Sequence, residues 1–244
     1  MKAFGITHRG SVRKENQDTF RFAITTGAEL LTAVLCDGMG GARAGSLAST
    51  IAADSFMSHA ANSLDESSNA SDMRSIMTEA VDFANTSVYD RSFSDFDCMG
   101  MGTTLVALLI SGKRVLIGNV GDSRAYMLFK DQLSQVTRDH SLVEDMVARG
   151  KLAREEARFH PKKNIITRAV GVEASVKADL TELKFSSDMR FLLCSDGLSN
   201  IIGEDELRGV LLENTEPEPA CDALLSLALE RGAPDNVTVL IAQH

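Results

Sequence analysis

Aspartates recur in this sequence where an apolar run gives way to glycine. Three runs end in this way, at Asp37-Gly38, Gly121-Asp122 and Asp196-Gly197. A carboxylate at the end of a strand is held by a rigid element and still reaches solvent, and the neighbouring glycine permits a sharp turn. A single pair of this kind is usually an ordinary turn. Three pairs in one chain indicate a site that is built from carboxylates.

Two further aspartates stand at predicted junctions: Asp18 follows Glu15-Asn16-Gln17, and Asp235 comes just before the last apolar run. Like charges do not crowd together unless cations neutralise them. Hard divalent ions take oxygen ligands, and Mg²⁺ keeps several waters while it uses only a few carboxylates. Two such ions lower the pKa of a bound water and balance the charge of a transferring phosphoryl group. The aspartates therefore favour metal-dependent phosphate hydrolysis with water as the nucleophile.

The elements that must position these aspartates are predicted from the spacing of apolar residues. Short β-branched or apolar runs predict strands at Leu31–Cys36, Thr103–Ile110, Arg114–Asn119, Ala125–Phe129, Arg190–Cys194 and Val237–Ala242. Apolar residues at three- and four-residue intervals predict helices at Ala44–Ser63, Asp72–Tyr89, Ser141–Arg149, Glu204–Leu212 and Glu218–Arg231. Short turns between strands predict antiparallel hairpins. The order of elements favours an α+β fold with helices outside stacked sheets, and an exposed loop at Ala60–Ser71.

The composition of the chain narrows the possible classes of function. The chain of 244 residues has a net charge of -9, which argues against a general affinity for nucleic acid or for anionic membranes. We expect one continuous domain over residues 1–244, because no repeat or Pro-rich linker divides the chain. We also expect a monomer. Neither a membrane-spanning run nor a signal peptide is evident, so the cytoplasm is the expected compartment. Four scattered cysteines are expected to be reduced thiols.

Eight blocks in the sequence match a known family in its order. They are Gly10–Arg13 with Asn16–Asp18, Cys36–Gly41, Gly100–Thr104, Gly118–Arg124, Asp139–Leu142, Ile166–Gly171, Cys194–Leu198 and Asp235–Thr238. With these blocks the chain resembles the metal-dependent protein phosphatases of the 2C type, especially the compact bacterial ones. The resemblance covers nearly the whole length, which makes it far more specific than one Asp-Gly-x-Gly-Gly motif.

The resemblance implies a four-layer α-β-β-α sandwich of two mostly antiparallel sheets, with two Mg²⁺ or Mn²⁺ ions in a cleft at one end. By similarity, Asp37 bridges the two ions and the carbonyl of Gly38 is a further ligand of the second. Asp196 and Asp235 are similar to ligands of the first ion. Asp122, together with Asp196, resembles the pair that holds a weaker third ion in bacterial members.

Two more residues have roles that the resemblance implies. Asp18 resembles the carboxylate that hydrogen-bonds metal-bound water, and such groups orient ligands and tune the acidity of the water. Arg13 matches the arginine that binds phosphate, and a guanidinium suits that role because its planar fork holds two oxygens at once. Taken alone, Arg13 would be read as a solvated surface residue.

The chain departs from some eukaryotic members at the position after Asp37-Gly38. Met39 stands there in place of a histidine that is proposed to protonate the leaving alkoxide, so the general acid stays unassigned. His140 and His160 are possible substitutes, although a lone histidine is more often a surface or helix-capping residue, and water is a third possibility. The basic stretch 149–164 corresponds to a mobile flap in the family, and we expect it, including His160, to contact substrate, although a solvated helix with a mixed Arg/Glu face is equally permitted.

Three functions remain in view at this stage. The first is an active phosphatase acting on phosphoserine and phosphothreonine in proteins, with a bacterial Ser/Thr kinase of eukaryotic type as its partner by analogy. The second is a catalytically silent phosphoprotein-binding module, which a damaged metal set would indicate; no expected ligand is missing here. The third is a two-metal hydrolase of nucleotides or small phosphate esters, which would need a base-recognition pocket.

Overall fold

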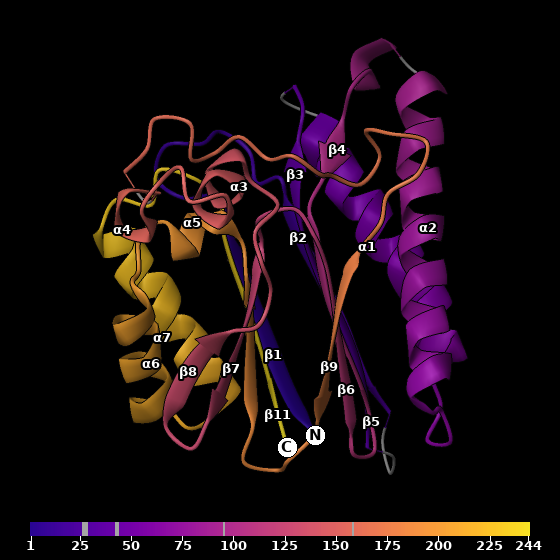
Figure 1. The fold of residues 1–244 in the computed structure, drawn as a ribbon, viewed down its shortest axis with the longest axis vertical. Coiled ribbons are helices and arrows are strands. Elements are labelled where there is room, and N and C mark those ends of the chain that lie inside the picture. Colours follow the sequence, from indigo (N-terminus) through magenta and orange to yellow (C-terminus); the bar gives the residue numbers. More distant parts are fainter. Residues whose placement is uncertain (26–28, 42–43, 95, 158) are drawn as a thin grey trace.

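A computed structural model describes residues 1–25, 29–41, 44–94, 96–157 and 159–244. In it, two antiparallel sheets lie face to face and helices cover both outer sides (Figure 1). The α+β sandwich predicted from the sequence is therefore confirmed. No helix in the described ranges combines the length and the apolar character that crossing a bilayer requires.

The two sheets are named after a central strand of each. The β11 sheet has the order β1 (Lys2–His8), β11 (Val237–Gln243), β10 (Arg190–Cys194), β7 (Arg124–Phe129) and β8 (Gln132–Gln135). The β3 sheet has the order β2 (Asp18–Thr25), β3 (Leu30–Met39), β5 (Leu105–Ser111), β6 (Arg114–Val120) and β9 (Asp179–Lys184), with β4 (Gly102–Thr103) also paired to β3. The pairing of β1 with β11 joins the two ends of the chain in one sheet.

Two long helices, α1 (Ala44–Ser63) and α2 (Ala70–Ser94), cover the β3 sheet. On the other side, α6 (Glu204–Glu213) and α7 (Pro217–Glu230) cover the β11 sheet. The short helices α3 (Leu142–Ala148), α4 (Arg154–Ala157) and α5 (Asp196–Ser199) gather at the end of the sheets far from both termini (Figure 1). A 3₁₀ turn at Phe96–Cys98 follows α2. Long elements therefore supply the frame, and short ones surround one end of it.

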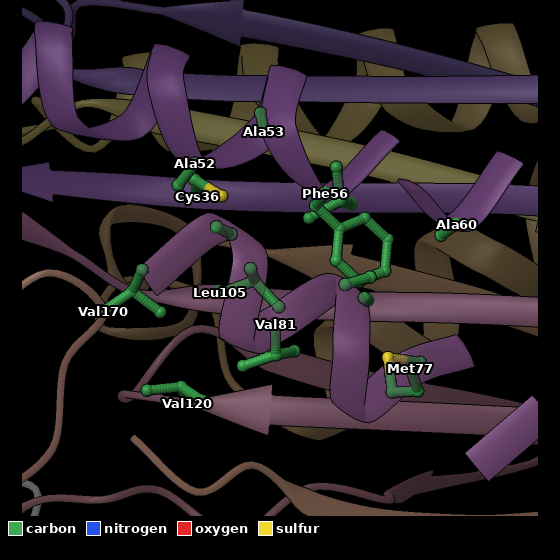
Figure 2. Close-up of a cluster of buried hydrophobic side chains, with 14 of the residues drawn as sticks. Cys36, Ala52, Ala53, Phe56, Ala60, Met77, Val81, Leu105, Val120 and Val170 are labelled. Carbon is green, nitrogen blue, oxygen red and sulfur yellow. The ribbon is translucent and has the colours of Figure 1, made fainter. Parts of the chain in front are cut away.

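The central strands are buried on both faces, which explains their nearly continuous apolar sequence. In β3, Leu31 and Leu35 pack between the sheets, while Val34 and Cys36 face the helices. On the helix side, α1 presents alanines and the single large ring of Phe56 to the sheet (Figure 2). Small alanines let the helix axis lie close to the strands, so the core excludes water along the whole of α1.

The structure corrects several predicted boundaries. The run 103–110 is two strands, because the Thr104 hydroxyl accepts the N–H of Asp37 in place of a regular ladder bond. The loop predicted at Ala60–Ser71 is shorter, since α1 continues to Ser63 and α2 begins at Ala70. Strands β1, β2, β8 and β9 were not predicted. These strands are edge strands or neighbours of loops, and their partly exposed mixture of polar and apolar residues lacks a clear alternation.

Candidate metal centre

The elements that carry the five predicted aspartates meet at the end of the sandwich where the short helices gather (Figure 1). Asp18 begins β2, Asp37 lies near the end of β3, Asp122 follows β6, Asp196 begins α5 just after β10, and Asp235 comes shortly before β11. Strands of both sheets therefore contribute, although the residues are far apart in the sequence. The pairing of strands, rather than any local motif, assembles the group.

A cleft of about 260 Å³ opens at this end of the molecule. The predicted residues among those that line it are Arg13, Asp37, Gly38, Asp122, Asp196 and Asp235. Asp18 lies behind this lining and is buried. The register of β2 with β3 places Asp18 directly opposite Asp37, so their side chains share one face of the sheet.

The carboxylate of Asp18 is held by two hydroxyl groups of the other sheet. Ser195 Oγ donates to Oδ2 at 2.8 Å, and Thr238 Oγ1 donates to the same oxygen at 2.7 Å. Oδ1 is buried and accepts no hydrogen bond from the described residues. Burial raises the pKa of Asp18 to about 7, against the lowering effect of the two hydroxyls. One oxygen of Asp18 is therefore fixed and the other is left for a ligand or a water.

Burial and mutual repulsion govern the protonation of the whole group. Burial raises the pKa of Asp37 well above its ordinary value, and the charges of Asp18 and Asp196 raise it further. The pKa of Asp122 is raised to about 7 by burial and then by the charge of Asp196. Burial also raises the pKa of Asp196, followed by repulsion from Asp235. The group as a whole lacks positive charge, which bound cations would supply.

Arg13 is the cation at the edge of the cleft. Its Nη2 donates to Asp235 Oδ2 at 2.7 Å, and this hydrogen bond raises the pKa of Arg13. Asn236 fixes the loop that carries Arg13: its Nδ2 donates to the carbonyls of Arg9 and Glu15, and its Oδ1 accepts the N–H of Gln17. Arg13 is half-exposed, so its guanidinium borders solvent as well as the aspartates.

Thr104 and Ser123 link the turns that carry Asp37 and Asp122. Thr104 Oγ1 accepts the N–H of Asp37 at 2.9 Å, and the hydroxyls of Thr104 and Ser123 lie 2.7 Å apart. The side chains of Thr104 and Ser123 are both buried. These two hydroxyl residues were not predicted as site residues, although both lie within the matching blocks. Ser123 follows the predicted ligand Asp122, which was the available signal, whereas Thr104 has no predicted ligand beside it in the sequence.

Gly38 is required by close packing as well as by its predicted role. A Cβ atom at this position would lie 2.0 Å from the carbonyl oxygen of Gly45, in the first turn of α1. The N–H of Gly38 donates to the carbonyl of Gln17 at 3.0 Å, which ties β3 to the residue before Asp18. Any larger residue here would push the α1 backbone away from the cleft.

The histidines considered as proton donors lie away from the cleft lining. His140 is buried, and its two ring nitrogens contact Gly121 and Asp179. His160 Nδ1 accepts the N–H of Lys162 within the flap, and His160 is not among the described residues that line the cleft. Its contact with substrate stays a prediction. Of the flap, Asn164 is among the residues that line the cleft. The flap residues Arg154, Ala157, Lys163 and Asn164 line an adjoining crevice together with Asp122 and Asp196.

The donor set fits a hard divalent cation. Carboxylate oxygens dominate the cleft, Arg13 forms its hydrogen bond with Asp235, and Asp18 Oδ1 has no donor among the described residues. Within those same ranges, no three acidic, histidine or cysteine side chains stand in finished ligand geometry. This pattern suits Mg²⁺ or Mn²⁺, which complete their coordination with several waters.

Comparisons with known proteins identify the family of the chain. A family model described as "Protein phosphatase 2C" matches residues 6–230. "Serine/threonine phosphatase stp" of Listeria innocua is 35% identical over 238 residues, covering 98% of this chain and 94% of that relative. The crystal structure of the Mycobacterium tuberculosis serine/threonine phosphatase PstP/Ppp superposes with a TM-score of 0.89 at 35% identity, covering 99% of this chain and 97% of the other.

A further structure bears on the metal. It is the catalytic domain of serine threonine protein phosphatase PstP in complex with two manganese ions, with a TM-score of 0.84, 34% identity, and coverage of 99% of this chain and 97% of the other. The similarity extends over almost the whole chain in sequence and in fold, and it includes every block quoted above. This chain therefore belongs to the protein phosphatase 2C family.

Proposed function

We propose that the chain hydrolyses phosphoserine and phosphothreonine in proteins, with Mn²⁺ or Mg²⁺ as its cofactor. The observation that carries this proposal is the convergence of five aspartates from both sheets on one cleft, with an arginine at its edge. Relatives that match over nearly their full length are named serine/threonine phosphatases, which supports the same activity. The intact aspartate set disfavours a silent binding module.

In this proposal the aspartates would hold two core ions and a third ion that binds more weakly. Asp37 and the carbonyl of Gly38 would hold the core pair, Asp196 and Asp235 would be further ligands of the first ion, and Asp122 with Asp196 would hold the third. When bound, these ions supply an acidified water and neutralise the charge of the phosphoryl group. Burial, and then the charges of neighbouring aspartates, raise the pKa of Asp37, Asp122 and Asp196, and bound cations would oppose both effects.

The chain's own polar groups would then orient the reactants. The Asp18 Oδ1 atom, which has no donor among the described residues, accepts a hydrogen from the attacking water while Ser195 and Thr238 hold Oδ2. Arg13 uses Nη2 on Asp235, and the other N–H groups of its planar fork can bind phosphate oxygens. Both residues therefore act by positioning rather than by forming a covalent intermediate.

The leaving serine or threonine oxygen needs a proton. No histidine is among the described residues that line the cleft, and Met39 lines it at the position after Gly38. His140 is excluded by its burial and by the contacts of both ring nitrogens. We infer that water in the cleft, rather than a histidine, protonates the leaving group.

We further propose that the phosphoproteins are made by a bacterial Ser/Thr kinase of eukaryotic type, and that the enzyme works in the cytoplasm. The relatives reported above are bacterial serine/threonine phosphatases, whose substrates such kinases would produce. All four cysteines are buried free thiols rather than disulfides, which is typical of a reducing compartment.

The test is hydrolysis of a phosphothreonine peptide, of p-nitrophenyl phosphate and of a nucleoside triphosphate by the purified protein. Each substrate is assayed with EDTA, Mg²⁺ or Mn²⁺, and with Asp37→Asn as the matched variant. We expect metal-dependent release of phosphate from the peptide, which Asp37→Asn abolishes. Preference for the nucleotide would favour a nucleotide hydrolase, whereas peptide binding without turnover would favour the silent module.

A further inference from the structure

His140 and Gly121 hold each other by two reciprocal hydrogen bonds. The N–H of Gly121 donates to His140 Nδ1 at 3.0 Å, and the N–H of His140 donates to the carbonyl of Gly121 at 2.9 Å. Asn119 Nδ2 contacts the same carbonyl at 3.3 Å and donates to the carbonyl of Arg138 at 3.0 Å. Both backbone polar groups of the residue before Asp122 are therefore bound to one neighbouring segment.

The other ring nitrogen of His140 fixes the orientation of the ring. Nε2 lies 3.1 Å from Asp179 Oδ2 on β9, and Arg168 Nη1 donates to the second oxygen of the same carboxylate at 2.7 Å. Since Nδ1 accepts from Gly121, the proton must be on Nε2, where it is donated to Asp179. The carboxylate thus selects the tautomer whose Nδ1 can accept the Gly121 N–H.

The turn that carries Asp122 is anchored on its other side as well. Ser123 is buried and its hydroxyl contacts that of Thr104, which in turn accepts the N–H of Asp37. Gly121 has φ of +107°, a conformation that few other residues adopt, so the turn depends on its contacts to keep this shape. Asp122 therefore sits between two anchored neighbours, with its carboxylate at the cleft.

We propose that His140 is a positioning residue that aims the Asp122 carboxylate into the cleft through Gly121, with Asp179 fixing the imidazole. This inference rests on the proposed function, because it assigns Asp122 to a metal. The segment after the flap takes part in the same arrangement, since Thr167 donates its N–H to the carbonyl of His140 at 2.8 Å. His140 thereby joins this segment, the edge strand β9 and the turn of Asp122.

Two amide substitutions separate positioning from simple packing. In His140→Asn, the side-chain carbonyl can take the place of Nδ1 and accept the Gly121 N–H, while the bond to Asp179 is lost. In His140→Gln, the longer amide can reach Asp179, but no acceptor remains beside Gly121. If His140 only filled space, the two variants would be affected according to their size and not according to the hydrogen bond that each keeps.

The experiment measures phosphate release from p-nitrophenyl phosphate over a range of Mn²⁺ concentrations, together with the melting temperature. In His140→Gln we expect either the activity to fall, or the half-saturating concentration of Mn²⁺ to rise, by about tenfold to a hundredfold. Effects of this size are known for other groups that orient a metal ligand. We expect the activity of His140→Asn to stay within about threefold of that of the parent enzyme. The control His59→Gln, at a partly exposed position, should stay within the same range. Melting temperatures of the two His140 variants should be similar.

A double-mutant cycle with Asp122→Asn decides whether His140 acts through Asp122. We expect His140→Gln to cost almost nothing further once Asp122 has lost its charge. Equal losses in the Asn and Gln variants, or independent losses in the cycle, would overturn the positioning role. An inactive parent enzyme with every metal would instead contradict the proposed function, so the two failures can be told apart.

Discussion

The middle of the sandwich and its metal-binding end are built from the same strands for opposite purposes. In β3, the stretch from Leu30 to Cys36 is buried and apolar except for Thr32, and the next residue, Asp37, is a carboxylate beside other carboxylates. Burial of the apolar stretch stabilises the fold, whereas burial of the Asp37 carboxylate, and then repulsion from its neighbours, raises the pKa of Asp37 and costs stability. The core therefore supplies the free energy of folding, whereas the carboxylates of the cleft lower the stability of the fold in order to provide a functional site.

Asp196→Asn should produce the largest effect, and this effect should be a loss of activity without a loss of stability. Removing one charge from the cleft weakens cation binding, and we expect phosphopeptide turnover to fall by about 1000-fold, in the range known for lost transition-state stabilisation. The melting temperature in EDTA should stay equal or rise, because a repelling charge has gone. Steady-state kinetics and calorimetry test this expectation, with Asp222→Asn on the exposed face of α7 as the control. A large fall in stability in EDTA would contradict the contrast between core and cleft.

Leu109→Ala should show the converse behaviour. Leu109 is fully buried on β5 beneath α1 and α2, and loss of its side chain should lower the free energy of unfolding by about 3 kcal/mol. Turnover per folded molecule should be unchanged, because the position is remote from the aspartates. Urea unfolding and kinetics at low temperature measure the two quantities separately. A matched fall in turnover of the folded enzyme would show that the core and the cleft are coupled.

The same division explains which features were predictable from the sequence. The aspartates at Asp37, Asp122 and Asp196 mark themselves by a local pattern of apolar run, carboxylate and glycine. Ser195 carries no such mark, since its function is to donate to Asp18, which lies 177 residues away. Contacts of this kind exist only after the two sheets have stacked, and no local spacing encodes them.

Edge strands were missed for a related reason. Asp179–Lys184 forms β9 at the edge of the β3 sheet. Its charged residues are exposed and its other residues are partly exposed, and the two kinds do not alternate regularly. Its conformation comes from pairing with β6, not from its own pattern. The same strand supplies Asp179 to His140, so missing the strand also hid the arrangement that holds the turn of Asp122.

Mn²⁺ should restore the stability that the cleft costs, and more so at higher pH. The pKa values of Asp18 and Asp122, raised to about 7 by burial, exceed those of the unfolded chain. The folded protein in EDTA therefore keeps protons that the unfolded chain releases, and its stability falls as pH rises from about 4 through about 7. Ion binding needs ionised ligands, so the added stability should be greater at about pH 8 than at about pH 6.

The size of this effect follows from mass action. An ion present at about 100 times its dissociation constant adds about 2.7 kcal/mol to the free energy of unfolding. Thermal melts with EDTA or Mn²⁺ at the two pH values measure it, and Asp37→Asn, which removes the predicted bridging ligand, should lose most of the gain. The same Mn²⁺ shift at both pH values would mean that the aspartates are ionised throughout this range.

Arg13→Ala should have the smallest effect, because the arginine lies at the edge where the cleft meets solvent. Loss of a charge-assisted bond to phosphate should raise KM for a phosphopeptide about tenfold, and Arg13→Lys should recover part of the loss because it keeps the charge without the planar fork. Stability should hardly change, since half-exposed ion pairs contribute little. Arg21→Ala, at the exposed pair with Asp54, serves as the control. A fall in kcat with an unchanged KM would place the action of Arg13 on Asp235, to which it is hydrogen-bonded, instead of on the phosphate.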